Sequence, residues 1–169
     1  MNKEALPCSS ADSGMGTSLS FAEALARSGR IAYTVVGVSM RPLIREGRDA
    51  VVIEQRSPEE IRQYDAVLFR RPGIKGRGEY VLHRVLARHA DGRFWIVGDN
   101  CVSGEDVAPE NVLGVMTALN RGGKDVRLTG NAYRAYVRLW CAPWRLRFAL
   151  LRILHLFRRT AGFIKRNLR

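Results

Sequence analysis

Short apolar segments separated by turn residues make up the middle of this chain. Strand-like runs lie at 31–38, 50–54, 66–70, 80–88, 94–97, 112–119 and 125–128. The breaks between these runs carry Gly, Pro or Asp, which favour tight turns. Because many short strands joined by tight turns are typical of small barrels and folded sheets, the pattern predicts a mostly β fold.

Two other segments have a helical pattern. Ser20 followed by Glu23 is the sequence signature of a capping box, so a short helix is predicted over 21–28. From residue 131 onward apolar side chains recur near one stripe of a helix, and Pro143 is expected to interrupt it, because proline lacks an N–H. The stripe consists of Leu146, Leu150, Ile153, Leu154, Phe157 and Phe163.

These patterns divide the chain into three parts. Residues 1–18 are rich in Ser and Gly and are predicted to form a disordered leader. Residues 19–130 are predicted to form the β domain, and residues 131–169 a basic amphipathic helical tail.

The positive charge belongs to the tail. Of the net charge of +12, ten Lys or Arg residues lie in 131–169, which contains no Asp or Glu. This asymmetry argues against a general nucleic-acid-binding surface and favours an anionic partner for the tail. An amphipathic basic helix is typical of peripheral binding to an anionic membrane surface. The alternative is that the apolar residues of the tail pack on the β domain.

The predicted location is the cytoplasmic face of a membrane. The first 20 residues contain no apolar core of an export signal, so no signal peptide is predicted. The chain also has no run of about 20 apolar residues, the length that a membrane-spanning helix requires.

Ser39 is a candidate nucleophile. It follows an apolar strand in the segment 37–42 (GVSMRP), where a turn presents a hydroxyl together with neighbouring backbone N–H groups. The alternative is a purely structural serine in a Gly/Pro turn.

His83 is a candidate general base. It lies within the predicted strand 80–88, and a neutral imidazole accepts a proton from a serine hydroxyl near pH 7. The alternative is a half-exposed strand histidine with no chemical role.

The segment 96–106 (IVGDNCVSGED) reads as an acidic loop that leaves a strand. One of its aspartates is expected to orient a histidine, as the third member of a catalytic triad does. The alternatives are an ordinary Asp-rich turn and a calcium loop, although the segment lacks the full EF-hand spacing. The three cysteines form no CxxC or Cys/His cluster, so neither a metal site, nor a cofactor, nor a disulfide framework is predicted.

Taken together and in order, these segments resemble the conserved boxes of type I signal peptidases. The matching segments are 39–42 (SMRP), 47–52 (GRDAVV), 64–69 (YDAVLF), 83–85 (HRV), 98–100 (GDN) and 114–115 (GV). The resemblance in order and spacing covers residues 34–119. Two segments depart from the usual pattern: Arg48 separates the expected Gly–Asp pair, and Tyr64 stands where Gly is common.

The resemblance implies a small signal-peptidase-like catalytic core that cleaves a signal or leader peptide from a precursor protein. Ser39 would be the nucleophile and His83 the general base, as in the endoplasmic-reticulum and archaeal type; most bacterial relatives carry Lys there. Asp106 would orient His83, with Asp99 as the alternative. The N–H of Ser39 would form part of an oxyanion hole supported by Gly37, Met40 and Pro42.

Two other functions fit parts of this pattern. The first is a self-cleaving repressor of the same clan, which uses a lysine base and an N-terminal DNA-binding domain. Against it, this chain has His83 at the base position, and residues 1–30 are too short and too rich in Gly and Ser for such a domain. A catalytically inactive binding module with the same fold is the other alternative.

Overall fold

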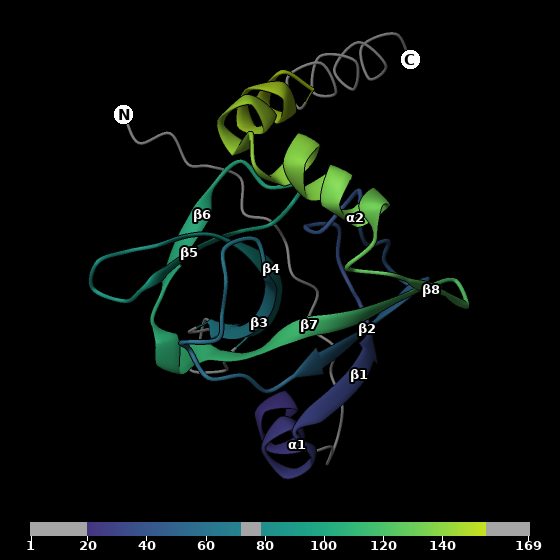
Figure 1. Ribbon diagram of the computed structural model, residues 1–169, viewed down its shortest axis with the longest axis vertical. Helices are drawn as coiled ribbons and strands as arrows, with labels where there is room; N and C mark the ends of the chain where they lie inside the picture. Colours follow the sequence, from purple (N-terminus) through teal and green to yellow (C-terminus); the bar gives the residue numbers. More distant parts are fainter. Residues whose placement is uncertain (1–19, 72–78, 155–169) are drawn as a thin grey trace, which may run out of the picture.

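The computed structural model describes residues 20–71 and 79–154 (Figure 1). Within them the fold is mostly β, with one antiparallel sheet curled into a half-barrel and helical segments at both ends. The predicted mostly β fold with a C-terminal helical segment is therefore confirmed. The predicted leader falls outside the described residues.

The first element is the predicted helix, α1 (Phe21–Ser28). The Ser20 hydroxyl accepts a hydrogen bond from the Glu23 N–H (3.2 Å), and the Glu23 carboxylate accepts one from the Ser20 N–H (2.9 Å). The capping box is therefore confirmed. The helix ends at Gly29, whose φ of 66° lies in the left-handed region.

The sheet contains eight strands in the described residues. They are β1 (Arg30–Thr34), β2 (Asp49–Glu54), β3 (Ala66–Arg71), β4 (Glu79–Arg88), β5 (Phe94–Val97), β6 (Gly104–Val107), β7 (Val112–Arg121) and β8 (Lys124–Val126). Their order across the sheet is β1-β2-β7-β3-β4-β5-β6, with β8 paired to β7, and the short 3₁₀ helix η2 (Pro109–Asn111) precedes β7.

Two strands differ from the sequence prediction. The strand predicted over 31–38 ends at Thr34, because the chain then leaves the sheet and forms the turn that carries Ser39. Strand β6 overlaps the end of the segment predicted to be an acidic loop. It pairs with β5, and Glu105 lies opposite Ile96.

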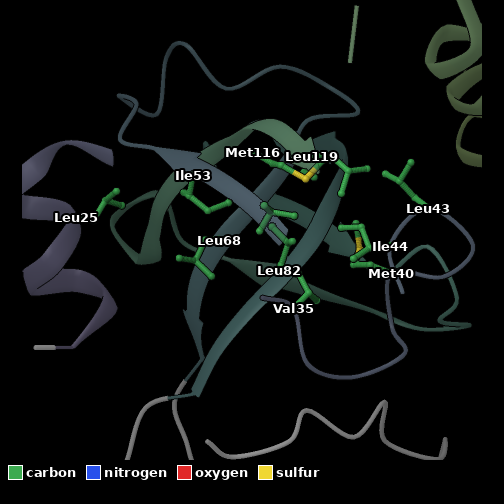
Figure 2. Close-up of a cluster of buried hydrophobic side chains, with 12 residues drawn as sticks. Leu25, Val35, Met40, Leu43, Ile44, Ile53, Leu68, Leu82, Met116 and Leu119 are labelled. Carbon is green, nitrogen blue, oxygen red and sulfur yellow. The ribbon is translucent and has the colours of Figure 1, made fainter. Parts of the chain in front are cut away.

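Both faces of the sheet are buried, so alternate residues of one strand enter different clusters. On β3, Leu68 belongs to the cluster inside the curl (Figure 2), whereas Phe69 belongs to the cluster on the other face. Met40, which directly follows Ser39, enters the inner cluster and is only 2% exposed. The candidate nucleophile is thus attached to the hydrophobic core.

The tail begins with α2 (Asn131–Tyr136) and a π-helical turn, η3 (Val137–Cys141). A turn at 142–143 follows, and residues 144–154 are helical again, so the predicted break at Pro143 is confirmed. Phe157 and Phe163 of the predicted stripe lie outside the described residues.

The described part of the tail packs against the sheet. Phe148 joins a cluster with Leu86, Val97 and Cys101, and Leu151 is also buried. The boundary predicted at residue 130 therefore separates two kinds of secondary structure but not two separately packed units.

The sequence predicted no disulfide framework, but one cysteine of the described residues does form a disulfide. Cys101 is disulfide-bonded, and Cys141 is a buried free thiol.

Candidate active site

The turn that carries Ser39 is fixed on both sides. On one side Met40 is buried, and its carbonyl accepts a hydrogen bond from the Ile44 N–H (3.0 Å). On the other side the Gly37 N–H donates to the Glu46 carboxylate (3.0 Å), and the φ of Gly37 is 95°. A positive φ of this size favours glycine. Met40 and Gly37 therefore support the position of Ser39, whereas Pro42 is exposed.

The segment 98–101 holds the Ser39 turn from the opposite side. The Asn100 N–H donates to the Ser39 carbonyl (2.7 Å), and the Asn100 side-chain amide donates to the Val38 carbonyl (3.2 Å). Two consecutive carbonyls of the serine turn are thus bound by one residue.

Gly98 lies between Ser39 and His83. A Cβ on Gly98 would lie 2.8 Å from the Ser39 carbonyl oxygen and 3.0 Å from Nε2 of His83. Because real Cβ atoms do not approach other atoms so closely, only glycine fits here. Absence of a side chain at residue 98 is what lets the serine turn and the imidazole come together.

His83 lies on β4 opposite Val67 of β3 and is only 4% exposed. Burial lowers the pKa of His83 from 6.5 to about 4, the positive charge of Arg71 acts in the same direction, and Asp99 opposes both. The ring is therefore neutral at pH 7, with one nitrogen free to accept a proton.

The Ser39 backbone and the His83 ring are neighbours across Gly98. Nε2 of His83 lies on the side of Gly98 and Ser39. Within the described part of the chain, no hydrogen bond joins the Ser39 hydroxyl to the ring.

The expectation that Asp106 orients His83 is not met. Asp106 binds Nε2 of His89 at 2.8 Å, in a pair in which both side chains are about half exposed. The acidic group beside His83 is Glu105, whose Oε1 lies 3.8 Å from Nδ1. The reason is the unpredicted strand β6, on which neighbouring side chains point to opposite faces.

Glu105 is itself held by Arg71 of β3. The Arg71 guanidinium donates to both carboxylate oxygens of Glu105, at 2.6 and 2.5 Å. Nδ1 of His83 is buried and has no hydrogen-bond partner. Glu105 therefore contributes negative charge beside the imidazole without accepting its proton in this state.

Asp99, the alternative orienting residue, is paired with Arg84 instead. Nε and Nη2 of Arg84 donate to the two carboxylate oxygens of Asp99 at 2.8 and 2.7 Å, and both side chains are fully buried. The pair attaches the 98–101 segment to β4, next to His83.

The tail completes the surroundings of Asp99. The Tyr136 hydroxyl donates to the Asp99 carboxylate (2.7 Å), and the Trp140 indole N–H donates to the Asp99 carbonyl (3.0 Å). Arg147 is also buried there, with Nη1 3.7 Å from the carboxylate, although none of its three guanidinium nitrogens has a hydrogen-bond partner. Sequence reasoning missed all three residues, because nothing local in the tail indicates a buried carboxylate.

Comparisons of this chain with protein-family models, with curated proteins and with solved structures give no match. No group of three or more metal-ligating side chains comes together among residues 20–71 and 79–154. None of the helices described in these residues is both long and apolar enough to cross a membrane.

The low pKa of His83 predicts a titration near pH 4. In the unfolded chain His83 is protonated below about pH 6.5, whereas in the folded protein it is protonated only below about pH 4. The unfolded state therefore binds more protons in this window, so His83 lowers the free energy of unfolding as the pH falls from 6.5 to 4. NMR titration of the imidazole ring tests the pKa, and His83→Gln should remove this part of the pH dependence. A midpoint at or above 6.5 would contradict the burial argument.

The roles of the two aspartates predict different effects on stability. Asp99→Asn leaves the buried Arg84 without its counterion and is expected to cost about 3–5 kcal/mol. Asp106→Asn is the matched control, and as a half-exposed surface change it is expected to cost less than about 0.5 kcal/mol. Urea denaturation measures both. Equal effects would show that the Asp99–Arg84 pair is not a structural determinant.

Proposed function

We propose that this chain is a serine endopeptidase of the signal-peptidase type, with Ser39 as nucleophile and His83 as general base. One observation carries the proposal. Ser39 and a buried, neutral histidine meet across Gly98, the position where the resemblance to signal peptidases places the first residue of the GDN segment. A serine close to a neutral imidazole is the arrangement that activates a hydroxyl for acyl transfer.

In the proposed reaction, Nε2 of His83 removes the proton of the Ser39 hydroxyl as Oγ attacks the scissile carbonyl. The resulting imidazolium returns this proton to the leaving amine, which yields an acyl-enzyme. Water then attacks the ester, with His83 again accepting and returning a proton. The product acid is released and Ser39 is regenerated.

The negative oxygen of the tetrahedral intermediate requires hydrogen-bond donors. The Ser39 N–H donates to no other atom within the described residues, so it is free for this role. Gly37 supplies no hydroxyl, and its N–H already donates to Glu46. The proposed oxyanion hole therefore relies on the Ser39 N–H and not on the residue two positions before it.

In the proposed mechanism Glu105 is the acidic partner of His83, the role that the resemblance implied for Asp106. In the proposed reaction the His83 ring becomes positively charged, and its Nδ1 lies 3.8 Å from Oε1 of Glu105. Opposite charges at such a distance attract strongly away from bulk water. We assign Glu105 as the residue that stabilises protonated His83, with Arg71 holding the carboxylate in position.

A peptide substrate is favoured by the pairing of β4. Residues 79–84 pair with β3 along one edge, whereas β5 pairs with β4 only from Arg84 onward. Within the described residues, strand pairing on the side that faces away from β3 is absent from Tyr80 to His83. An extended chain can add to such an edge and bring its carbonyl to Ser39. Cleavage within an extended segment suits a signal or leader peptide of a precursor protein.

The central test is the loss of peptidase activity in Ser39→Ala and His83→Ala. Because the members of a catalytic triad act as a unit, each change is expected to lower kcat/KM at least about 1,000-fold on a precursor peptide. The matched controls are Ser103→Ala and His89→Ala, which are expected to retain activity. Circular dichroism should show that all four variants are folded.

The same assay separates the two acidic neighbours and the competing functions. Glu105→Gln is expected to lower kcat/KM by at least about tenfold, whereas Asp106→Asn leaves it nearly unchanged. A fluorophosphonate probe should label wild-type Ser39 but not Ser39→Ala. No labelling and no cleavage of any precursor peptide would favour an inactive binding module, and cleavage restricted to this chain itself would favour the repressor-like alternative.

A further inference from the structure

The large apolar side chains that the described residues leave exposed lie in two places. Val36 and Val38 precede Ser39, with exposures of 47% and 40%. The others lie on the tail: Leu139, Leu146, Leu150, Ile153 and Leu154, the first two being 78% and 71% exposed. Exposed apolar groups concentrated in this way indicate an interaction surface.

The packing of the tail determines which face is presented. Phe148 and Leu151 are buried, and the ring of Trp144 contacts both Phe148 and Trp95 of β5 at centroid distances of 5.4 and 4.7 Å. These residues attach the inner face to the sheet. Four apolar residues of the predicted stripe are exposed instead of packed in the core: Leu146, Leu150, Ile153 and Leu154.

Positive charge accompanies the exposed apolar residues. Arg138, Arg145 and Arg152 are all exposed, and the tail contains no acidic residue that could neutralise them. A surface that is apolar and basic at the same time matches an anionic lipid bilayer, whose headgroups attract arginine and whose acyl boundary accepts leucine. A nucleic acid would use the arginines but leave the leucines in water.

We infer that the outer face of the tail is a binding surface for anionic lipid bilayers. It consists of Leu139, Leu146, Leu150, Ile153 and Leu154 together with Arg138, Arg145 and Arg152. Binding buries the apolar side chains at the headgroup boundary and relieves the repulsion among the arginines.

The attachment of the tail adds a consequence that rests on the proposed peptidase function. Asp99 binds Tyr136 and Trp140 of the tail, and the next residue, Asn100, binds the carbonyls of Val38 and Ser39. Asp99 and Asn100, which are consecutive, thus connect the first part of the tail to the serine turn. Bilayer binding therefore holds Ser39 near the membrane, where the cleavage site of a membrane-bound precursor would lie.

The experiment is co-sedimentation of the full chain with vesicles of phosphatidylcholine, alone or mixed with phosphatidylglycerol. Binding should increase with phosphatidylglycerol and decrease with salt. Deletion of the tail is unsuitable, because it removes the partners of Asp99. The apolar variant combines Leu146→Gln, Leu150→Gln and Ile153→Gln, and the basic variant combines Arg138→Gln, Arg145→Gln and Arg152→Gln.

Both variants should bind the mixed vesicles at least about tenfold more weakly than wild type. The matched control removes the same charge elsewhere, by Arg27→Gln, Arg62→Gln and Arg127→Gln, all exposed residues outside the tail. It should bind like wild type. All three variants should cleave a soluble peptide at the wild-type rate, so a failure of the surface is distinguishable from a failure of the peptidase.

Three results would overturn the inference. The first is wild-type vesicle binding by the apolar variant, and the second is equal weakening by the control, which would show that only net charge matters. The third is preferential binding of single- or double-stranded nucleic acid over the mixed vesicles at physiological salt, unaffected by the three glutamines of the apolar variant.

Discussion

The arrangement of this candidate site depends on one buried ion pair, Asp99 with Arg84. Neither side chain reaches water, so each charge is stabilised almost entirely by the other and by the groups that bind it. Two parallel hydrogen bonds fix the orientation of the carboxylate, and with it the backbone of residues 98–101. Because Asn100 holds the serine turn and Gly98 leaves space beside His83, the relative position of Ser39 and His83 follows from this pair.

Charge around His83 is distributed so that its ring stays neutral. Burial is the largest influence on the pKa of the imidazole, Arg71 adds to it, and Asp99 partly opposes both. The Glu105 carboxylate lies 3.8 Å from Nδ1 of His83 and is hydrogen-bonded by Arg71. Two acidic residues of one short segment thus have different partners: Asp99 binds Arg84 in the interior, and Glu105 binds Arg71 beside the His83 ring.

The tail is joined to the site in the same way. Its inner face completes the surroundings of Asp99 through Tyr136 and Trp140, and its outer face leaves leucine and arginine side chains exposed. The guanidinium of Arg147 is buried there without a hydrogen bond, and burial of a charge costs free energy. Its attraction to the Asp99 carboxylate, 3.7 Å away, opposes this cost. A helix that served packing alone would gain nothing from the exposed leucines, whereas one that also meets a bilayer would.

What the sequence determined by itself was local. The capping box of Ser20 and Glu23, the break at Pro143 and most of the strands follow from propensities and periodicities over a few residues, and the candidates Ser39 and His83 were readable from short motifs. Only the tertiary structure decided which acidic side chain lies beside His83, because that depends on β6 pairing with β5 and on the face that each residue of β6 then takes. It also decided the partner of Asp99 and the packing of the tail, since contacts between residues distant in the chain leave no local pattern.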